Sequence, residues 1–183
     1  MKTIFSLLLA RITLICFTAV LAACASAPGQ NPVALNVQEI EALGLRNLNN
    51  PEGKFYTSGQ PTKEDLDALS AAGVQNVVSV RTEGELDWDE KAYVESLGMT
   101  FYSVPVAGAS GVTYENAAAL ANLLNTIEGE ATVLHCGSGN RVGALVALNE
   151  LQSNGGDVDA AVEKGKDWGL TGLESQIRSE AGN

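Results

Sequence analysis

Histidine and cysteine are scarce in this chain of 183 residues, which has one histidine, His135, and three cysteines, Cys16, Cys24 and Cys136. The first two cysteines lie in an N-terminal targeting segment described below. Cys136 is then the one thiol of the folded domain, and it has no partner there for a disulfide. One histidine and one available cysteine cannot build a zinc site. We therefore expect no metal and no cofactor.

Basic residues are also few. The chain has 11 lysines and arginines against 22 aspartates and glutamates, a net charge of −11. Without the targeting segment, which holds Lys2 and Arg11, nine basic residues face 22 acidic ones and the net charge is −13. Such a surface disfavours binding to nucleic acid or, through basic patches, to membranes. We expect no nucleic-acid partner, and we expect the domain to act as a monomer.

Residues 1–23 resemble a secretory signal peptide, because Lys2 gives a charged start and a long apolar region follows. The run at 21–24, LAAC, resembles the bacterial lipobox. The resemblance implies cleavage before Cys24, a lipid anchor on its sulfur, and, with Ala25 next, an outer-membrane location facing the periplasm. The alternative is a transmembrane anchor, but Arg11 in the middle of the apolar run argues against it.

The rest of the chain predicts one α/β domain. Residues 24–50 are expected to be a tether and an N-terminal arm, since 25–32 are rich in Ser, Pro and Gly; the domain then spans 51–183. Apolar, β-branched runs predict buried strands at 74–80, 99–104 and 131–134. Helical patterns at 63–72, 87–97, 113–127 and 142–151 alternate with them, and further helices are expected at 157–168 and 170–178. This alternation predicts a central, mostly parallel sheet flanked by helices on both faces.

The most informative stretch is 131–143, ATVLHCGSGNRVG. It predicts a strand, a Gly-rich loop and the start of a helix, an arrangement whose backbone amides and helix dipole bind anions. The planar guanidinium of Arg141 matches a tetrahedral oxyanion. Cys136, at the mouth of such a site, is expected to ionise readily and to act as a thiolate nucleophile.

These residues carry a family resemblance. His135-Cys136 followed by a Gly-rich loop, Arg141 and a helix resembles the cysteine-dependent tyrosine and dual-specificity phosphatase superfamily. With SGQP at 58–61 and VVSVR at 77–81, the chain further resembles the phosphatase-like domain of the beta-lactamase-hydrolase-like family, over most of residues 55–151. The resemblance implies a three-layer phosphatase fold, and hydrolysis of phosphate esters through a phosphocysteine intermediate, as in protein tyrosine phosphatases.

The resemblance also implies roles for single residues. Cys136 is the nucleophile, and Arg141 clamps the oxyanion. His135 shapes the loop through hydrogen bonds, although a buried histidine at a strand end explains it equally well. The backbone amides expected to bind substrate are those of Gly137, Ser138, Gly139 and Asn140.

The loop is short, however, because tyrosine phosphatases place one more residue between the cysteine and the arginine. Rhodanese-type sulfurtransferases use a loop of the present length, and a smaller ring of amides suits a persulfide. A sulfurtransferase carrying a persulfide on Cys136 is therefore the first alternative. A non-catalytic envelope lipoprotein that binds oxyanions is the second.

A general acid is also missing from its usual place. Related phosphatases carry an aspartate on a loop before the cysteine, but the corresponding residues 105–112, PVAGASGV, have no carboxylate. A positioned acid contributes typically 10²–10⁴-fold to such a reaction. We expect Glu83 to take this role, because it follows the strand that ends at Arg81. The other candidates are Asp87, Asp89 and Glu115. Arg81 itself is expected to pair with a loop carboxylate.

Overall fold

The structure is a computed structural model, and it describes residues 34–180. The predicted signal peptide and the predicted lipidation site at Cys24 lie outside the described residues. No helix within 34–180 is both long and apolar enough to cross a membrane. The helices and strands, in chain order, are α1 (Val37–Ala42), β1 (Asn49–Glu52), β2 (Phe55–Ser58), α2 (Lys63–Ala71), β3 (Asn76–Ser79), α3 (Glu90–Ser96), β4 (Thr100–Ser103), α4 (Tyr114–Thr126), β5 (Thr132–His135), α5 (Asn140–Ser153), α6 (Val158–Asp167) and α7 (Glu174–Glu180).

The five strands form one sheet in the order β1-β2-β5-β3-β4. Strands β2, β5, β3 and β4 run parallel, and β1 pairs with β2 in the antiparallel sense. Every residue of β3 and β5 is buried, as expected for parallel strands covered on both faces. The predicted α/β fold with a central, mostly parallel sheet is confirmed.

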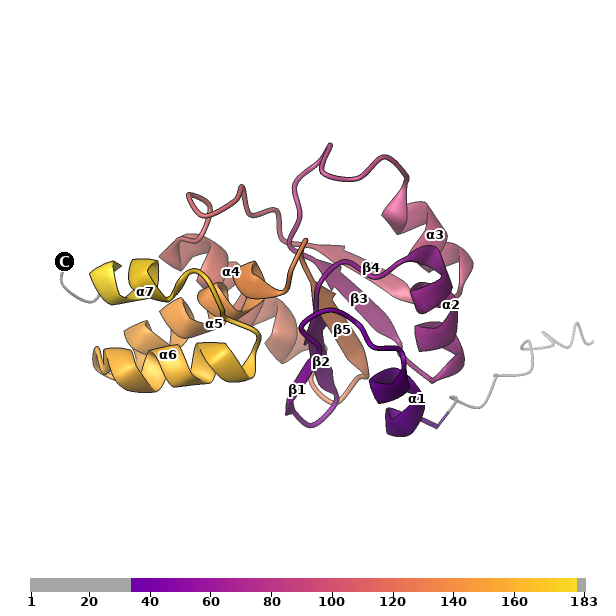
Figure 1. Cartoon of the computed structure of the whole chain (residues 1–183), viewed down its shortest axis with the longest axis horizontal. Helices are drawn as coiled ribbons and strands as arrows, with labels where there is room; N and C mark the ends of the chain where they lie inside the picture. Colours follow the sequence, from indigo (N-terminus) through magenta and orange to yellow (C-terminus); the bar gives the residue numbers. More distant parts are fainter. Residues whose placement is uncertain (1–33, 181–183) are drawn as a thin grey trace, which may run out of the picture. The chain divides into compact units, whose positions relative to one another are not determined.

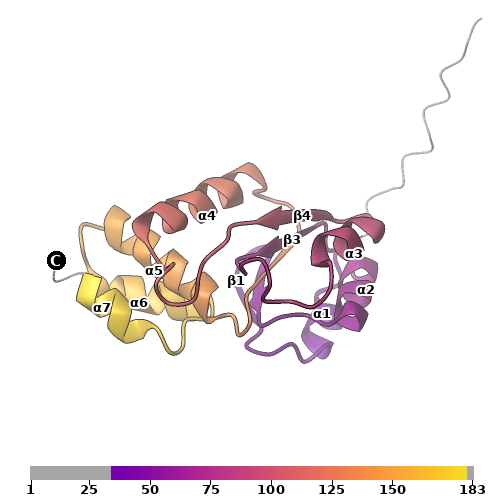
Figure 2. The same cartoon turned by 90° about the horizontal axis from the view of Figure 1, so that it is seen from above.

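Helices cover both faces of the sheet (Figures 1 and 2). On one face, α1, α2 and α3 pack over a core that includes Val77 and Val133. On the other face, α4 to α7 pack over a second core that includes Val78 and Leu134. Neighbouring residues of one strand point to opposite faces, so each strand contributes to both cores.

The carboxyl ends of the parallel strands meet at one edge of the sheet. Ser58, His135 and Ser79 pair in register across β2, β5 and β3, and Ser103 of β4 pairs with Ser79. Ligand sites of open α/β sheets lie at this edge. The loop that starts at Cys136 follows directly from it.

Local signals set the helix starts as predicted. Thr62 and Asp65 form a capping box at the start of α2. Thr113 is the N-cap of α4. Gly73, just after α2, has a φ of 89°, the left-handed conformation expected of a helix stop.

The structure adds detail at both ends of the domain. Strand β1 begins at Asn49 and pairs with β2, so the residues just before position 51 belong to the sheet. The N-terminal arm packs on the domain, because Ile40 of α1 is fully buried in the core on that face. At the other end, α7 begins at Glu174 and not at Leu170, which is instead buried in the second core.

Candidate active site

Cys136 begins the loop between β5 and α5, and backbone donors surround its sulfur. Sγ accepts hydrogen bonds from the amides of Gly139, at 3.1 Å, and Ser138, at 3.5 Å. Gly139 is the N-cap of α5 and no side chain caps that helix end, so the positive end of the dipole faces the loop. Cys136 is 1 % exposed, which places the sulfur at the base of this anion-binding loop.

Gly139 is required by the shape of the loop. Its φ is 84°, a conformation that side chains with a Cβ rarely adopt. A Cβ at this position would lie 2.6 Å from Nδ2 of Asn47 and 3.3 Å from the backbone of Ser58. The tight packing holds the Gly139 amide toward the sulfur of Cys136.

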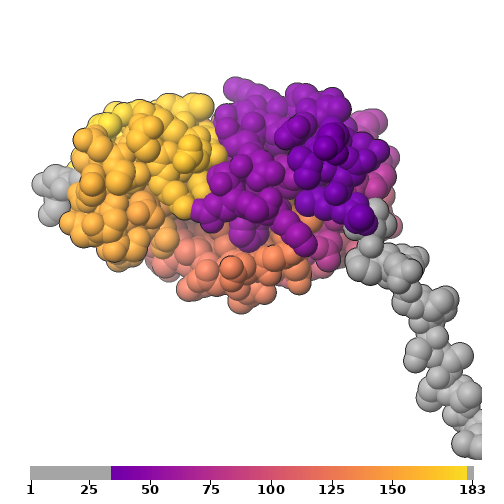
Figure 3. All heavy atoms as spheres, turned by 90° about the horizontal axis from the view of Figure 1, so that it is seen from below, coloured from indigo at the N-terminus to yellow at the C-terminus, as the bar shows by residue number. Residues whose placement is uncertain are grey.

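Asn47 fastens the loop from outside. Its Nδ2 donates to the carbonyl of Ser138 at 3.1 Å and to the carbonyl of Gly169 at 2.9 Å. Asn47 has a φ of 52° and is the one residue other than glycine with positive φ in the described chain. In Figure 3 the N-terminal part of the domain borders the C-terminal part on the surface, in agreement with these two bonds. The arm therefore belongs to the support of the site.

A second side chain anchors the start of α5. Oδ1 of Asn140 accepts from the amides of Thr171, at 2.8 Å, and Gly172, at 3.0 Å. Asn140 was predicted to offer a backbone amide to substrate. Its side chain ties the loop to the segment before α7.

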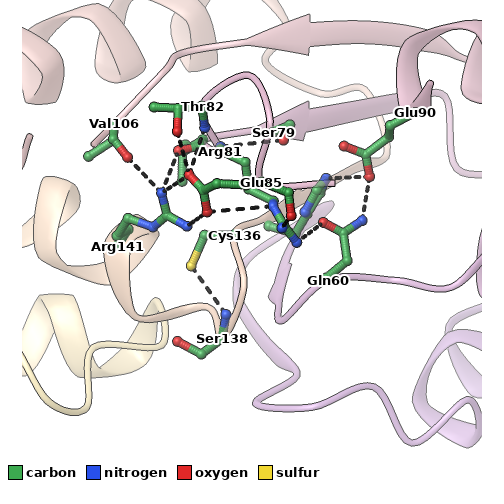
Figure 4. A network of polar contacts seen from close by, with 12 residues as sticks. Gln60, Ser79, Arg81, Thr82, Glu85, Glu90, Val106, Cys136, Ser138 and Arg141 are labelled. Atoms are coloured by element: carbon green, nitrogen blue, oxygen red, sulfur yellow. Dashed lines mark hydrogen bonds and ion pairs between the residues drawn. The ribbon is translucent and has the colours of Figure 1, made fainter. Parts of the chain in front are cut away.

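Arg141 is the second residue of α5 and is held by Glu85 (Figure 4). Its two terminal nitrogens donate to the two carboxylate oxygens of Glu85 at 2.8 and 2.6 Å. The carbonyl oxygens of Val106, at 2.6 Å, and Val80, at 3.4 Å, accept from the same guanidinium. These four polar contacts fix the plane of the guanidinium beside the loop.

The charges of this pair support one another. Hydrogen bonds from Arg141 above all, opposed by burial and assisted by Thr82, lower the pKa of Glu85 to about 2. The bond to Glu85 raises the pKa of Arg141, and Cys136 adds to the rise although burial opposes it. Cys136 therefore adds to the negative charge near this guanidinium.

A chain of polar contacts continues from Glu85 behind the loop. The Arg81 guanidinium donates to the backbone carbonyl of Glu85 and to Oε1 of Gln60 at 2.8 Å. Nε of Arg81 also lies 3.7 Å from the Glu85 carboxylate, so its predicted pairing with a loop carboxylate is confirmed. Nε2 of Gln60 donates to Oε1 of Glu90 at 2.5 Å.

The chain ends at His135, which is 0 % exposed. Nε2 of His135 lies 3.2 Å from Oε1 of Glu90, an ion-pair distance without good hydrogen-bond geometry for either ring nitrogen. Burial raises the pKa of Glu90, but the contacts with His135, Gln60 and Ser79 outweigh it and the net pKa is lowered. His135 is therefore a buried residue at the end of β5, directly before Cys136, and it lies next to the Glu90 carboxylate.

The structure thus brings most of the predicted residues together. Cys136, Arg141, His135 and the 137–140 loop meet at the carboxyl edge of the sheet. Glu83, predicted as the general acid, is exposed and has no polar contact with Arg141, whereas Glu85, two residues later, does. The sequence analysis missed Glu85, Glu90 and Asn47. The signal for Glu85 was its position four residues after Arg81 in the same loop.

Two further features bear on ligands. A pocket of about 460 Å³ lies beside the polar network. Its lining residues all fall between positions 79 and 105, and they include Arg81, Trp88, Glu90 and Phe101. Among residues 34–180, no group of three or more His, Cys, Asp or Glu side chains is arranged to hold a metal ion.

Comparison with known proteins was made at the level of sequence families and of folds. The family described as "DSP-PTPase phosphatase fused to NAD+ Kinase" matches residues 31–176. No curated protein matches the chain. Among solved structures, a candidate phosphatase (DUF442) from Shewanella putrefaciens has 18% identity and a TM-score of 0.60, covering 80% of this chain and 96% of its own.

Two other solved structures share the fold at the same sequence identity. A candidate phosphatase from Neisseria meningitidis has 18% identity and a TM-score of 0.60, covering 73% of this chain and 97% of its own. TpbA from P. aeruginosa, in a complex with phosphotyrosine, has 18% identity and a TM-score of 0.53, covering 84% of this chain and 99% of its own. At such identities the likeness shows a shared fold.

Proposed function

This chain belongs to the DSP-PTPase phosphatase family, and from that premise we propose that it hydrolyses phosphate esters through a phosphocysteine on Cys136. One observation carries the proposal. The sulfur of Cys136 lies at the N-terminus of α5 with two loop amides pointing at it and the Arg141 guanidinium beside it. Donors placed in this way stabilise charge on a phosphoryl group held above the sulfur.

The residues divide the reaction into two steps. In the first, the Cys136 thiolate attacks phosphorus, an S–P bond forms, and the P–O bond to the leaving group breaks. In the second, water attacks the phosphocysteine, releasing inorganic phosphate and restoring the thiolate. The loop amides and Arg141 hold the equatorial oxygens in both steps.

The probe suited to a first test is an aryl phosphate such as p-nitrophenyl phosphate, since the structurally similar TpbA binds phosphotyrosine. The wild-type protein should release phosphate from this substrate, and Cys136→Ser should abolish the release. Arg141→Lys keeps the charge but loses the fork that binds Glu85 and phosphate, so activity should fall by about 10²-fold or more. Activity that persists in Cys136→Ser contradicts the proposal.

Sulfur transfer is the second candidate function, because four residues, and not one more, separate Cys136 from Arg141. Such a protein takes a sulfur atom from a donor as a persulfide on Cys136 and passes it to an acceptor thiol. After treatment with thiosulfate or polysulfide, mass spectrometry should then find one added sulfur atom on Cys136 and none in Cys136→Ser. A protein that releases phosphate but never carries the added sulfur decides for the phosphatase.

We further propose that the domain acts at the cell envelope as a lipoprotein anchored through Cys24, facing the periplasm from the outer membrane, and as a monomer. The LAAC run at 21–24 and the Ser- and Pro-containing stretch after it support this proposal. Expression of the full chain in a bacterium should place it in the membrane fraction, with Cys24→Ala moving it out of that fraction. A Cys24→Ala protein that stays in the membrane fraction argues for a different anchor.

A further inference from the structure

The loop that follows β4 reaches the reaction site but carries no acid. The carbonyl of Val106 accepts a hydrogen bond of 2.6 Å from Arg141, so this loop lies against the oxyanion clamp. Its residues 105–112, PVAGASGV, include no carboxylate and no imidazole. No side chain there can therefore give a proton to a departing oxygen at neutral pH, because the hydroxyl of Ser110 is far too weak an acid.

All 22 aspartates and glutamates of the chain lie within residues 34–180. Two of them belong to the polar network of the site. Glu85 has a pKa of about 2 and is bound through both oxygens to Arg141. Held as a carboxylate by Arg141, it has no proton to donate at neutral pH. Glu90 is 6 % exposed, has a lowered pKa, and is enclosed by His135 and Gln60.

The carboxylates considered as general acids in the sequence either bind another group or make no polar contact with the site. Asp89 caps α3 by accepting from the amide of Ala92 at 2.9 Å. Glu83, Asp87 and Glu115 are exposed, and among the described residues none of the three has a polar contact with Cys136, Arg141 or the 105–112 loop. The one histidine, His135, is fully buried beneath the loop against Glu90.

The lack of a placed proton donor among these residues affects the first chemical step. When the P–O bond breaks, its electron pair goes to the leaving oxygen, which departs either as an anion or as a neutral alcohol that has gained a proton. An alkoxide is a very poor anion and needs the proton. A phenolate has a conjugate acid with a pKa of about 10, like tyrosine, and a phosphate leaving group is more stable still, with a second pKa of about 6.

We propose that this site acts on phosphate compounds whose leaving group departs unassisted as a stable anion, namely aryl phosphates and phosphoanhydrides, and that it discriminates against alkyl phosphates such as phosphoserine. The inference rests on the proposed phosphatase function. The rest of the site supplies what such substrates need, because Arg141 and the loop amides stabilise the phosphoryl group in transfer. The guanidinium of Arg81, next to Glu85, adds a second positive charge to the polar network of the site.

The test is a leaving-group series on the purified domain. We expect kcat/KM to fall steeply from acetyl phosphate and 2,4-dinitrophenyl phosphate through p-nitrophenyl phosphate to phenyl phosphate. A phosphoserine peptide should be slower than a matched phosphotyrosine peptide by about 10²–10⁴-fold, the contribution that an absent acid would have made. Equal rates on the two peptides, both lost in Cys136→Ser, overturn the inference and leave the phosphatase function intact.

A carboxylate scan identifies any acid that the geometry does not reveal. Loss of a general acid slows phenyl phosphate strongly and spares 2,4-dinitrophenyl phosphate, because the latter needs no proton. We expect Glu83→Gln, Asp87→Asn, Asp89→Asn and Glu115→Gln each to change kcat/KM on both substrates by the same factor, within about threefold. A selective loss of about 10²-fold on phenyl phosphate in any one of them overturns the inference and names the acid. If no substrate in the series shows turnover that depends on Cys136, the proposed function itself fails.

Discussion

The side-chain nitrogen Nδ2 of Asn47 donates a hydrogen bond to the backbone carbonyl oxygen of Ser138 at 3.1 Å, although 91 positions separate the two residues in the chain. In a planar trans peptide the carbonyl and the following N–H point in opposite directions. By holding the Ser138 carbonyl outward, Asn47 turns the N–H of Gly139 inward, where it donates to the sulfur of Cys136. Asn47 thus orients a backbone donor of the loop without touching the sulfur.

Replacement of Asn47 by glycine should weaken both the fold and the loop. Glycine keeps the positive φ and removes only the side chain, so the two hydrogen bonds donated by Nδ2 are lost, together with the longer one that Oδ1 accepts from Asn49. We expect a loss of about 1–3 kcal/mol in the free energy of unfolding, measured by urea titration. We also expect weaker inhibition by inorganic phosphate. Asn122→Ala, an exposed asparagine of α4, is the control, and an unchanged inhibition constant in Asn47→Gly contradicts the role given to Asn47.

Glu85 predicts a pH dependence of stability. Its folded pKa of about 2 lies below the ordinary value of 4.5 for a glutamate, so the stabilisation it gives is present above about pH 4.5 and is lost as the pH falls toward 2. Glu85→Gln should cost on the order of 1–2 kcal/mol at pH 7, since the side chain is 29% exposed and solvent screens part of the ion pair.

Urea unfolding of the wild type and Glu85→Gln at pH 7 and pH 3 measures this directly. The difference between the two proteins should shrink at pH 3. Glu83→Gln, an exposed neighbour, serves as the control for stability. A difference that stays constant or grows on acidification would show that Glu85 is not held as a carboxylate by Arg141.

Glu90 predicts that removing its carboxylate is costlier than neutralising it. In Glu90→Ala, Gln60 loses its buried hydrogen-bond acceptor and His135 loses the carboxylate 3.2 Å from its Nε2, and we expect a loss of about 3 kcal/mol or more. Glu90→Gln retains one carbonyl acceptor for Gln60 and should lose less. Thermal melts of the two variants decide the order, and equal melting temperatures would rule out a buried polar pair at this position.

Two glycines of the loop make a matched pair. Gly139→Ala places a Cβ 2.6 Å from Asn47 Nδ2 at a φ of 84°, whereas Gly137→Ala meets nothing closer than Arg141 at 4.0 Å and has an ordinary φ. We expect the first change to destabilise the domain by about 1–3 kcal/mol or more and the second by less than about 0.5 kcal/mol. Melting temperatures of the two proteins are the measurement, and a reversed order would mean that the loop adopts another backbone shape.

The sequence carried enough information for the layers of the fold and the centre of the site. The buried strand at 132–135 follows from the largely apolar run at 131–134, and Thr62 and Thr113 are local caps, so pattern and propensity find them. Strand β1 was not predicted, because its sequence NNPE is short and polar. It lies at the edge of the sheet, where pairing with β2 stabilises the extended conformation. Glu85 resembled any loop carboxylate, and Asn47 acts across a long chain separation.

The burial of Cys136 has a consequence for oxidation. The residue is 1 % exposed, and it is the single cysteine of residues 34–180. A small oxidant such as hydrogen peroxide could convert the thiolate to a sulfenic acid, but no second thiol within these residues stands ready to trap that species as a disulfide. Recovery then depends on a reductant small enough to enter the loop, and prolonged exposure should drive the sulfur to irreversible sulfinic acid.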